Sequence, residues 1–217
     1  MKKRTYKAAD EIRTNIISTA GRFFIKYGFD KTTLKMIANE LGVTPGTITY
    51  HFNRKAEILF RIFMNFSHSI HMCIQAHLTD GFNHYLAFCI ESIHFYRKVL
   101  ENESIRTLFY SNVEYVALWN KEWRPNTEIN FRTISDDFHT GLSDEEIHVA
   151  STIYLGSLSI LLDDCTQGSG TIDIDKYNYH LIHLLGLLTG LDRLTIQKNI
   201  TRAFELADGY DLPAIRF

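Results

Sequence analysis

The stretch LKMIANELGVTPGTITYHFNRK, residues 34–55, decides the fold of the amino-terminal part of this chain. Its apolar residues recur at helical spacing and predict one buried stripe: Leu34, Ile37, Ala38 and Leu41. Gly42 follows as the residue that ends this helix, because glycine adopts the left-handed conformation at little cost. The sequence therefore predicts a short helix that closes in a tight turn.

A second short helix is predicted directly after this turn. Thr44 is a favourable N-cap, and Pro45 occupies the first helical position, where its missing N–H group is not needed. Ile48 and Phe52 are expected to face inward. Two short helices joined by a tight turn form a helix-turn-helix, whose second helix enters the major groove of DNA.

The residues on both sides extend this pattern. RTNIISTAGRFFIKYGF (residues 13–29) and Thr32-Thr33 precede the unit, and TITYHF (residues 47–52) leads to Lys55. Residues 13–60 together closely resemble the amino-terminal DNA-binding domain of the TetR family of bacterial transcriptional regulators. Thr49 departs from the family pattern, which usually has an aromatic residue there, and this implies a different base or phosphate partner.

The resemblance implies an all-α chain with two domains. Residues 1–53 are expected to form a three-helix helix-turn-helix DNA-binding domain, and residues 54–217 a helical domain for ligand binding and dimerisation. The implied function is that of a ligand-responsive transcriptional regulator, a repressor released from its double-stranded DNA operator by a small-molecule effector. A regulator controlled by a protein partner, with no small-molecule pocket, is the alternative.

The resemblance places the DNA contacts on the second short helix and its borders. Thr33 and Thr44 would offer amide and hydroxyl groups to phosphates, although either residue is also explained as a helix cap alone. Arg, Asn and Gln are absent between Thr44 and Phe52, so specificity is expected to rest on threonine methyl groups, the basic residues 2–4 and DNA shape. The expected contacts are Thr33, Lys35, Thr44, Pro45, Gly46, Thr47, Thr49, Tyr50, His51 and Lys55.

Composition agrees with a helical DNA-binding protein. The chain has 217 residues, 45% of them hydrophobic, and only three prolines. Residues 1–60 contain 11 Lys and Arg against 5 Asp and Glu, whereas residues 61–217 contain 12 against 20. This asymmetry would orient the amino-terminal part toward phosphate. No signal peptide or membrane span is recognised, so a cytoplasmic location is expected.

Helical periodicity continues through the rest of the chain. Residues 1–7 are expected to be a loose basic arm, followed by helices over about 8–27, 54–78 and 82–101. The region 103–140 is expected to be helical with an interruption at Pro125. A capping box at Ser143–Glu146 would open a helix to residue 164, and further helices are expected over about 174–191 and 195–207.

The helices at 143–164 and 174–191 are apolar on all sides. Such a helix must be covered on more than one face, and a second copy of the chain would provide the second cover in a four-helix bundle. TetR relatives dimerise in this way; a fully buried hairpin in a monomer is the alternative. The expected dimer interface is formed by Tyr154, Leu158, Leu161, Leu181, Leu184 and Leu188.

Large aromatic residues are concentrated between residues 82 and 138. TetR relatives bind small molecules in this region, and an aromatic cavity would suit an apolar or aromatic effector whose binding tilts the fourth helix. Ordinary core packing is the competing explanation for each residue. The candidate pocket residues are Phe88, Phe95, Phe109, Tyr115, Trp119 and Trp123.

Catalytic, metal and cofactor sites are not expected. His68 and His71, like His180 and His183, are spaced three apart on helices, but a metal site needs further ligands that the sequence does not indicate. The three cysteines are read as reduced core residues. No nucleophile elbow, phosphate loop or metallohydrolase motif supports an all-α enzyme with an attached helix-turn-helix.

Overall fold

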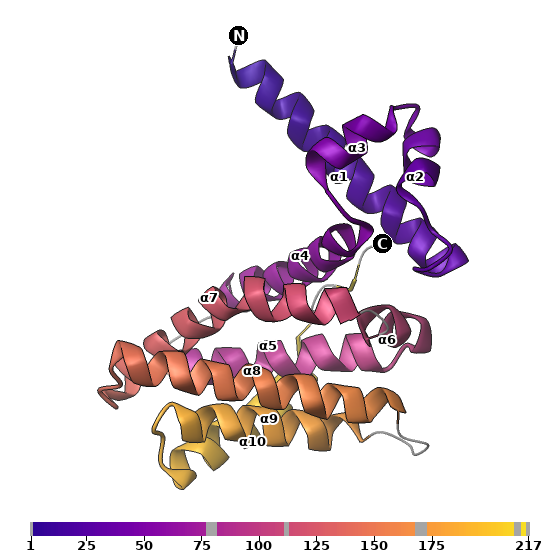
Figure 1. Cartoon of the computed structure of the whole chain (residues 1–217). Helices are drawn as coiled ribbons and strands as arrows, with labels where there is room; N and C mark the ends of the chain where they lie inside the picture. The colour runs from indigo at the N-terminus through magenta and orange to yellow at the C-terminus, as the bar shows by residue number, and fades with distance from the viewer. Residues whose placement is uncertain (1, 77–81, 111–112, 168–172, 211–213, 216–217) are drawn as a thin grey trace.

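The computed structural model describes residues 2–76, 82–110, 113–167, 173–210 and 214–215; for residues 2–9, 110, 113–120 and 162–167 it describes the backbone alone. The described residues form helices α1 to α10 and contain no strand, as the all-α prediction required (Figure 1). The bounds are α1 Lys2–Tyr27, α2 Leu34–Leu41, α3 Pro45–His51, α4 Lys55–Ala76, α5 His84–Leu100, α6 Glu103–Tyr110, α7 Val113–Phe138, α8 Asp144–Gln167, α9 Ile174–Leu188 and α10 Arg193–Ala207.

Helices α1 to α3 form a small head, and the predicted turn signals act as expected. The Thr33 hydroxyl accepts a hydrogen bond from the Met36 N–H group and caps α2. Gly42 has φ 65° and ends α2, and the Val43 N–H group donates to the Ala38 carbonyl across the turn. The Thr44 hydroxyl caps α3 through the Thr47 N–H group.

The core of the head fixes how α3 is rotated. Ile48 and Phe52 are buried, as predicted, and belong to the same hydrophobic core as the buried α1 residues Ile16, Ala20 and Phe24. Because these two side chains anchor one side of α3, its other side and its first turn remain at the surface.

Two expectations about helix boundaries were wrong. Helix α1 begins at Lys2 instead of near residue 8, since residues 2–10 contain no glycine or proline that would stop it. Helix α7 continues through Pro125. Proline removes the hydrogen bond to the Lys121 carbonyl, but both residues are exposed, so water can bond that carbonyl instead.

Helices α4 to α10 form the body below the head (Figure 1). Helix α5 is central and packs against α4, α6, α7, α9 and α10. Helix α9 approaches it closely at Gly186, where an added Cβ would lie 2.6 Å from Tyr85 Oη. Ser143 and Glu146 form the predicted capping box that opens α8, with Ser143 N donating to Glu146 Oε2 at 2.8 Å.

Candidate DNA-reading surface and body cavity

Helix α3 presents its first turn and one side to solvent. Thr44, Pro45, Gly46 and Thr49 are exposed, and Tyr50 is 84% exposed. Tyr50 therefore does not pack within the head. An exposed helix amino terminus with small side chains permits close approach of the backbone to a groove wall.

The threonine hydroxyl groups on this surface already have hydrogen-bond partners within α3 and its N-cap. Thr44 Oγ1 lies 3.0 Å from Thr47 Oγ1, and the Thr49 hydroxyl donates to the Gly46 carbonyl at 3.2 Å. These bonds hold the hydroxyls, which leaves the threonine methyl groups as the groups most readily offered to a thymine methyl.

Thr33, Lys35 and His51 border this surface. Thr33 and Lys35 are exposed at the start of α2, where backbone N–H groups can bind a phosphate. His51 is half-buried at the end of α3 and its ring contacts that of Tyr50 edge to face. The structure thus places the predicted contacts of α2 and α3 at the surface of one small domain.

Lys55 has a structural role that the sequence did not reveal. Its Nζ donates to the carbonyl oxygens of Phe29, Asp30 and Thr32 at 2.7, 3.2 and 3.3 Å. It also lies 4.3 Å from the centre of the Phe29 ring. All three ammonium protons have partners within the chain, so Lys55 fastens the α1–α2 connection to the start of α4 instead of projecting as a free charge toward phosphate.

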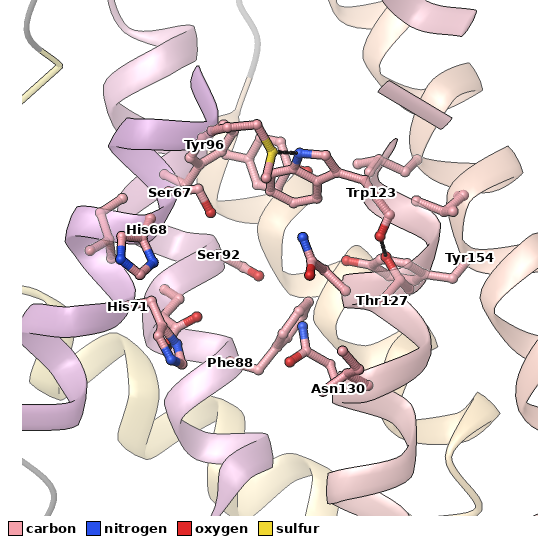
Figure 2. Close-up of a pocket in the computed structure, with 18 residues that line it drawn as sticks. Ser67, His68, His71, Phe88, Ser92, Tyr96, Trp123, Thr127, Asn130 and Tyr154 are labelled. Atoms are coloured by element: carbon pink, nitrogen blue, oxygen red, sulfur yellow. Dashed lines mark hydrogen bonds and ion pairs between the residues drawn. The ribbon is translucent and has the colours of Figure 1, made fainter. Parts of the chain in front are cut away.

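The body contains a cavity of about 260 Å³ between α4, α5, α7 and α8 (Figure 2). Its apolar wall includes Phe88, Phe95, Tyr96, Trp123 and Tyr154. The Trp123 indole N–H donates to the Met64 sulfur and joins α7 to α4 beside the cavity. A ligand in this space would contact α4, the helix that continues into the head.

Polar groups line the cavity on its α4, α5 and α7 sides. They come from Ser67, His68 and His71 on α4, Glu91 and Ser92 on α5, and Asn126, Thr127 and Asn130 on α7. His71 Nδ1 lies 2.9 Å from Glu91 Oε1, and this hydrogen bond raises the pKa of His71. Burial raises the pKa of the Tyr154 hydroxyl, which therefore stays neutral. The site combines aromatic surface with a few fixed polar groups, as small-molecule sites do.

The predicted pocket residues have different positions. Phe88, Phe95 and Trp123 line the cavity. Phe109 is 2% exposed and packs against Phe63 and Phe95, so it belongs to the core behind the cavity wall. The side chains of Tyr115 and Trp119 lie outside the described residues. The contributions of α4 and α8 were missed; the pair His68 and His71 was a signal in the sequence for α4, and no such signal pointed to α8.

Helices α8 and α9 each have a buried and an exposed apolar face. Three residues assigned to a dimer interface, Tyr154, Leu158 and Leu181, are at most 4% exposed within one chain, and the first two line the cavity. That assignment was wrong, because periodicity shows that a helix is apolar all round but not which face its own chain covers. Leu161, Leu184 and Leu188 are half-buried. The exposed apolar residues are Val149, Ile153 and Ile160 on α8 and Leu187 on α9.

The histidines do not gather into a metal site in the described part of the chain, where no group of three or more metal-ligating side chains occurs. His180 and His183 lie beside Tyr179, whose ring stacks on that of His183. Within the same residues, no helix has the length and hydrophobicity needed to cross a bilayer.

Sequence comparison matches the head to known regulators. The family model described as "Bacterial regulatory proteins, tetR family" matches residues 16–62. The HTH-type transcriptional regulator TtgR of Pseudomonas putida is 49% identical over 59 residues. That match covers 27% of this chain and spans only 28% of the length of TtgR.

Comparison with solved structures extends the similarity to the whole fold. The structure of RolR with resorcinol superposes with a TM-score of 0.62 at 17% identity, covering 97% of this chain and 99% of that one. SmeT, the repressor of the Stenotrophomonas maltophilia multidrug efflux pump SmeDEF, gives a TM-score of 0.53 at 19% identity, covering 81% and 88%. A SmeT–triclosan complex also matches. At these identities the likeness concerns the fold alone.

Proposed function

We propose that this chain, which belongs to the TetR family of bacterial regulatory proteins, represses transcription by binding an operator as a dimer and is released by a small molecule. The observation that carries the proposal is the exposed first turn of α3, held by the buried Ile48 and Phe52 on a head that matches the family. We place the domain boundary after Asn53, between the end of α3 at His51 and the start of α4 at Lys55.

DNA recognition would proceed through small side chains. Thr47 and Thr49 would meet base edges, while Thr33, Lys35 and Tyr50 would position the head on phosphates. Because α3 has no Arg, Asn or Gln, bidentate base readout from this helix is excluded, and DNA shape would supply part of the specificity. Against single-base operator variants, a loss of about 3 kcal/mol at one guanine would contradict this.

Dimerisation would use the exposed faces of α8 and α9. Val149, Ile153, Gly156 and Ile160 are spaced along one side of α8, and an added Cβ at Gly156 would have no neighbour within 4 Å among the described residues. A partner helix can therefore approach this side closely. Two copies joined on a two-fold axis would present two α3 helices to half-sites about 34–36 Å apart.

The dimer proposal is tested by one charge placed on that face. Ile153→Glu, at a position 47% exposed, is expected to give a monomer in light scattering and to weaken operator binding. Leu194→Glu is the matched control, since Leu194 is 79% exposed but lies on α10. A dimer that survives Ile153→Glu would reject this interface.

The effector would occupy the body cavity. The cavity is bounded by α4 and α7, so a bound molecule that favours a tilted α4 would change the spacing of the two heads. Resorcinol in RolR and triclosan in SmeT support an aromatic effector, and the open cavity supports a small molecule over control by a protein partner.

The proposal as a whole is tested by selection of DNA from a randomised duplex pool with the purified full chain. We expect enrichment of a palindromic site bound by a dimer, at least about a thousandfold tighter than unrelated duplex. A failure to enrich any sequence at low salt would overturn the proposed function.

A further inference from the structure

The titratable side chains of the cavity lining centre on Glu91, which is hydrogen-bonded to His71 and raises the pKa of that histidine. Glu91 is the one carboxylate among the described lining residues, and none of those residues is lysine or arginine. The Glu91 side chain is 21% exposed, so its charge is only partly screened by water. A carboxylate in such a wall attracts a cation and repels an anion.

The size and surface of the cavity limit the rest of the ligand. A volume of about 260 Å³ lies below the usual range for drug-sized ligands, which favours one or two rings. The rings of Phe88 and Trp123 border this space (Figure 2), and Phe95 also lines it. Aromatic faces attract cations.

We infer that the cavity selects a small aromatic amine whose ammonium group pairs with Glu91. The inference rests on the proposed function, because it assigns the chemistry of the effector to this same cavity. The Ser92 hydroxyl on α5 and the Asn130 amide on α7 face the same space from two different helices and could bind a hydroxyl or second amine on the ring.

The same carboxylate joins the body to the helix that continues into the head. Glu91 lies on α5, and its present partner, His71, lies on α4 at 2.9 Å. An ammonium group that binds Glu91 competes with His71 and so removes one bond between α4 and α5. The Glu91 carboxylate thereby links ligand binding to the position of α4.

The test is a calorimetric titration of the full chain with three probes that share one ring system: naphthylmethylamine, naphthol and naphthoate. At about pH 7.5 these carry a positive, zero and negative charge. We expect the amine to bind at least about tenfold tighter than naphthoate. Glu91→Gln should abolish this preference and change naphthol binding by less than about threefold.

Glu128→Gln is the matched control. Glu128 pairs with His148 at the same distance of 2.9 Å, but it lies outside the cavity lining. This variant should leave all three affinities unchanged. His71→Ala, which frees Glu91 of its partner, should tighten amine binding, and thermal melts would show that each variant is folded.

Several outcomes would overturn the inference: naphthoate binding as tightly as the amine, an unchanged preference in Glu91→Gln, or no probe binding at all. Operator affinity is measured separately in the same samples. If the amine binds through Glu91 and operator affinity is unchanged, the charge selectivity stands and the release step of the proposed function fails.

Discussion

Replacement of Lys55 by methionine separates a structural lysine from a phosphate contact. The Nζ donates to three carbonyl oxygens, of which the Phe29 oxygen is closest at 2.7 Å, and it lies over the Phe29 ring. A hydrogen bond from a charged group contributes about 1.5–3 kcal/mol, and a cation–π contact adds about 0.5–1 kcal/mol. Since one ammonium serves all of these contacts, we expect Lys55→Met to lower the free energy of unfolding by about 3 kcal/mol.

Lys35→Met is the matched control for this experiment. Lys35 is exposed on α2, so its replacement should change the free energy of unfolding by less than about 0.5 kcal/mol. Urea denaturation followed by circular dichroism measures both changes.

The salt dependence of DNA binding gives the second readout. Loss of one phosphate contact reduces the slope of log affinity against log salt by about 0.9 per protomer. We expect this reduction for Lys35→Met, measured by fluorescence anisotropy on the selected duplex. Lys55→Met should weaken binding through disorder of the head while keeping the slope. A stable Lys55→Met variant with a reduced slope would refute this reasoning and assign Lys55 to phosphate.

Three further changes test the body. Gly186→Ala should lower the free energy of unfolding by about 2–4 kcal/mol in urea titrations, because its Cβ would lie 2.6 Å from Tyr85 Oη and disturb the hydrogen bond that this hydroxyl donates to the Ile182 carbonyl. A higher free energy of unfolding would show that α5 and α9 separate freely. Asn178 is 1% exposed, and both of its side-chain polar atoms lack a partner among the described residues. Asn178→Leu should therefore raise the free energy of unfolding by about 1–2 kcal/mol, and a lower free energy of unfolding would indicate a hidden partner. Glu91 raises the pKa of His71, so the pair stabilises the fold fully below the unfolded value of about 6.5 and this contribution disappears as pH rises through the folded pKa; the stability difference from His71→Asn should follow that course, and a difference that grows with pH would contradict it.

Local signals accounted for most of the helix boundaries. Thr33, Gly42 and Thr44 act within their own turns, and a cap or a left-handed glycine acts over three or four residues. The same holds for the capping box at Ser143. One of the two exceptions, at Pro125, arose because the burial of its helix face, unknown from sequence, decides whether water can replace the lost hydrogen bond.

Some functional assignments likewise followed from local sequence signals, whereas others depended on how the helices pack. Exposure of Thr44 and Tyr50 follows from the burial of Ile48 on the opposite side of one short helix, so periodicity was sufficient. Tyr154 was misassigned because the side of α8 that meets the body depends on the rotation of that helix against α5 and α7. A sequence pattern does not contain that angle.

The sequence by itself determined the helix-turn-helix, because caps, glycine and apolar spacing act between residues close along the chain. The tertiary structure alone decided that Lys55 holds the Phe29 carbonyl, that His71 meets Glu91, and that α4, α5, α7 and α8 line a cavity. These features join residues twenty or more positions apart, and only the packing of whole helices sets the distances between such residues.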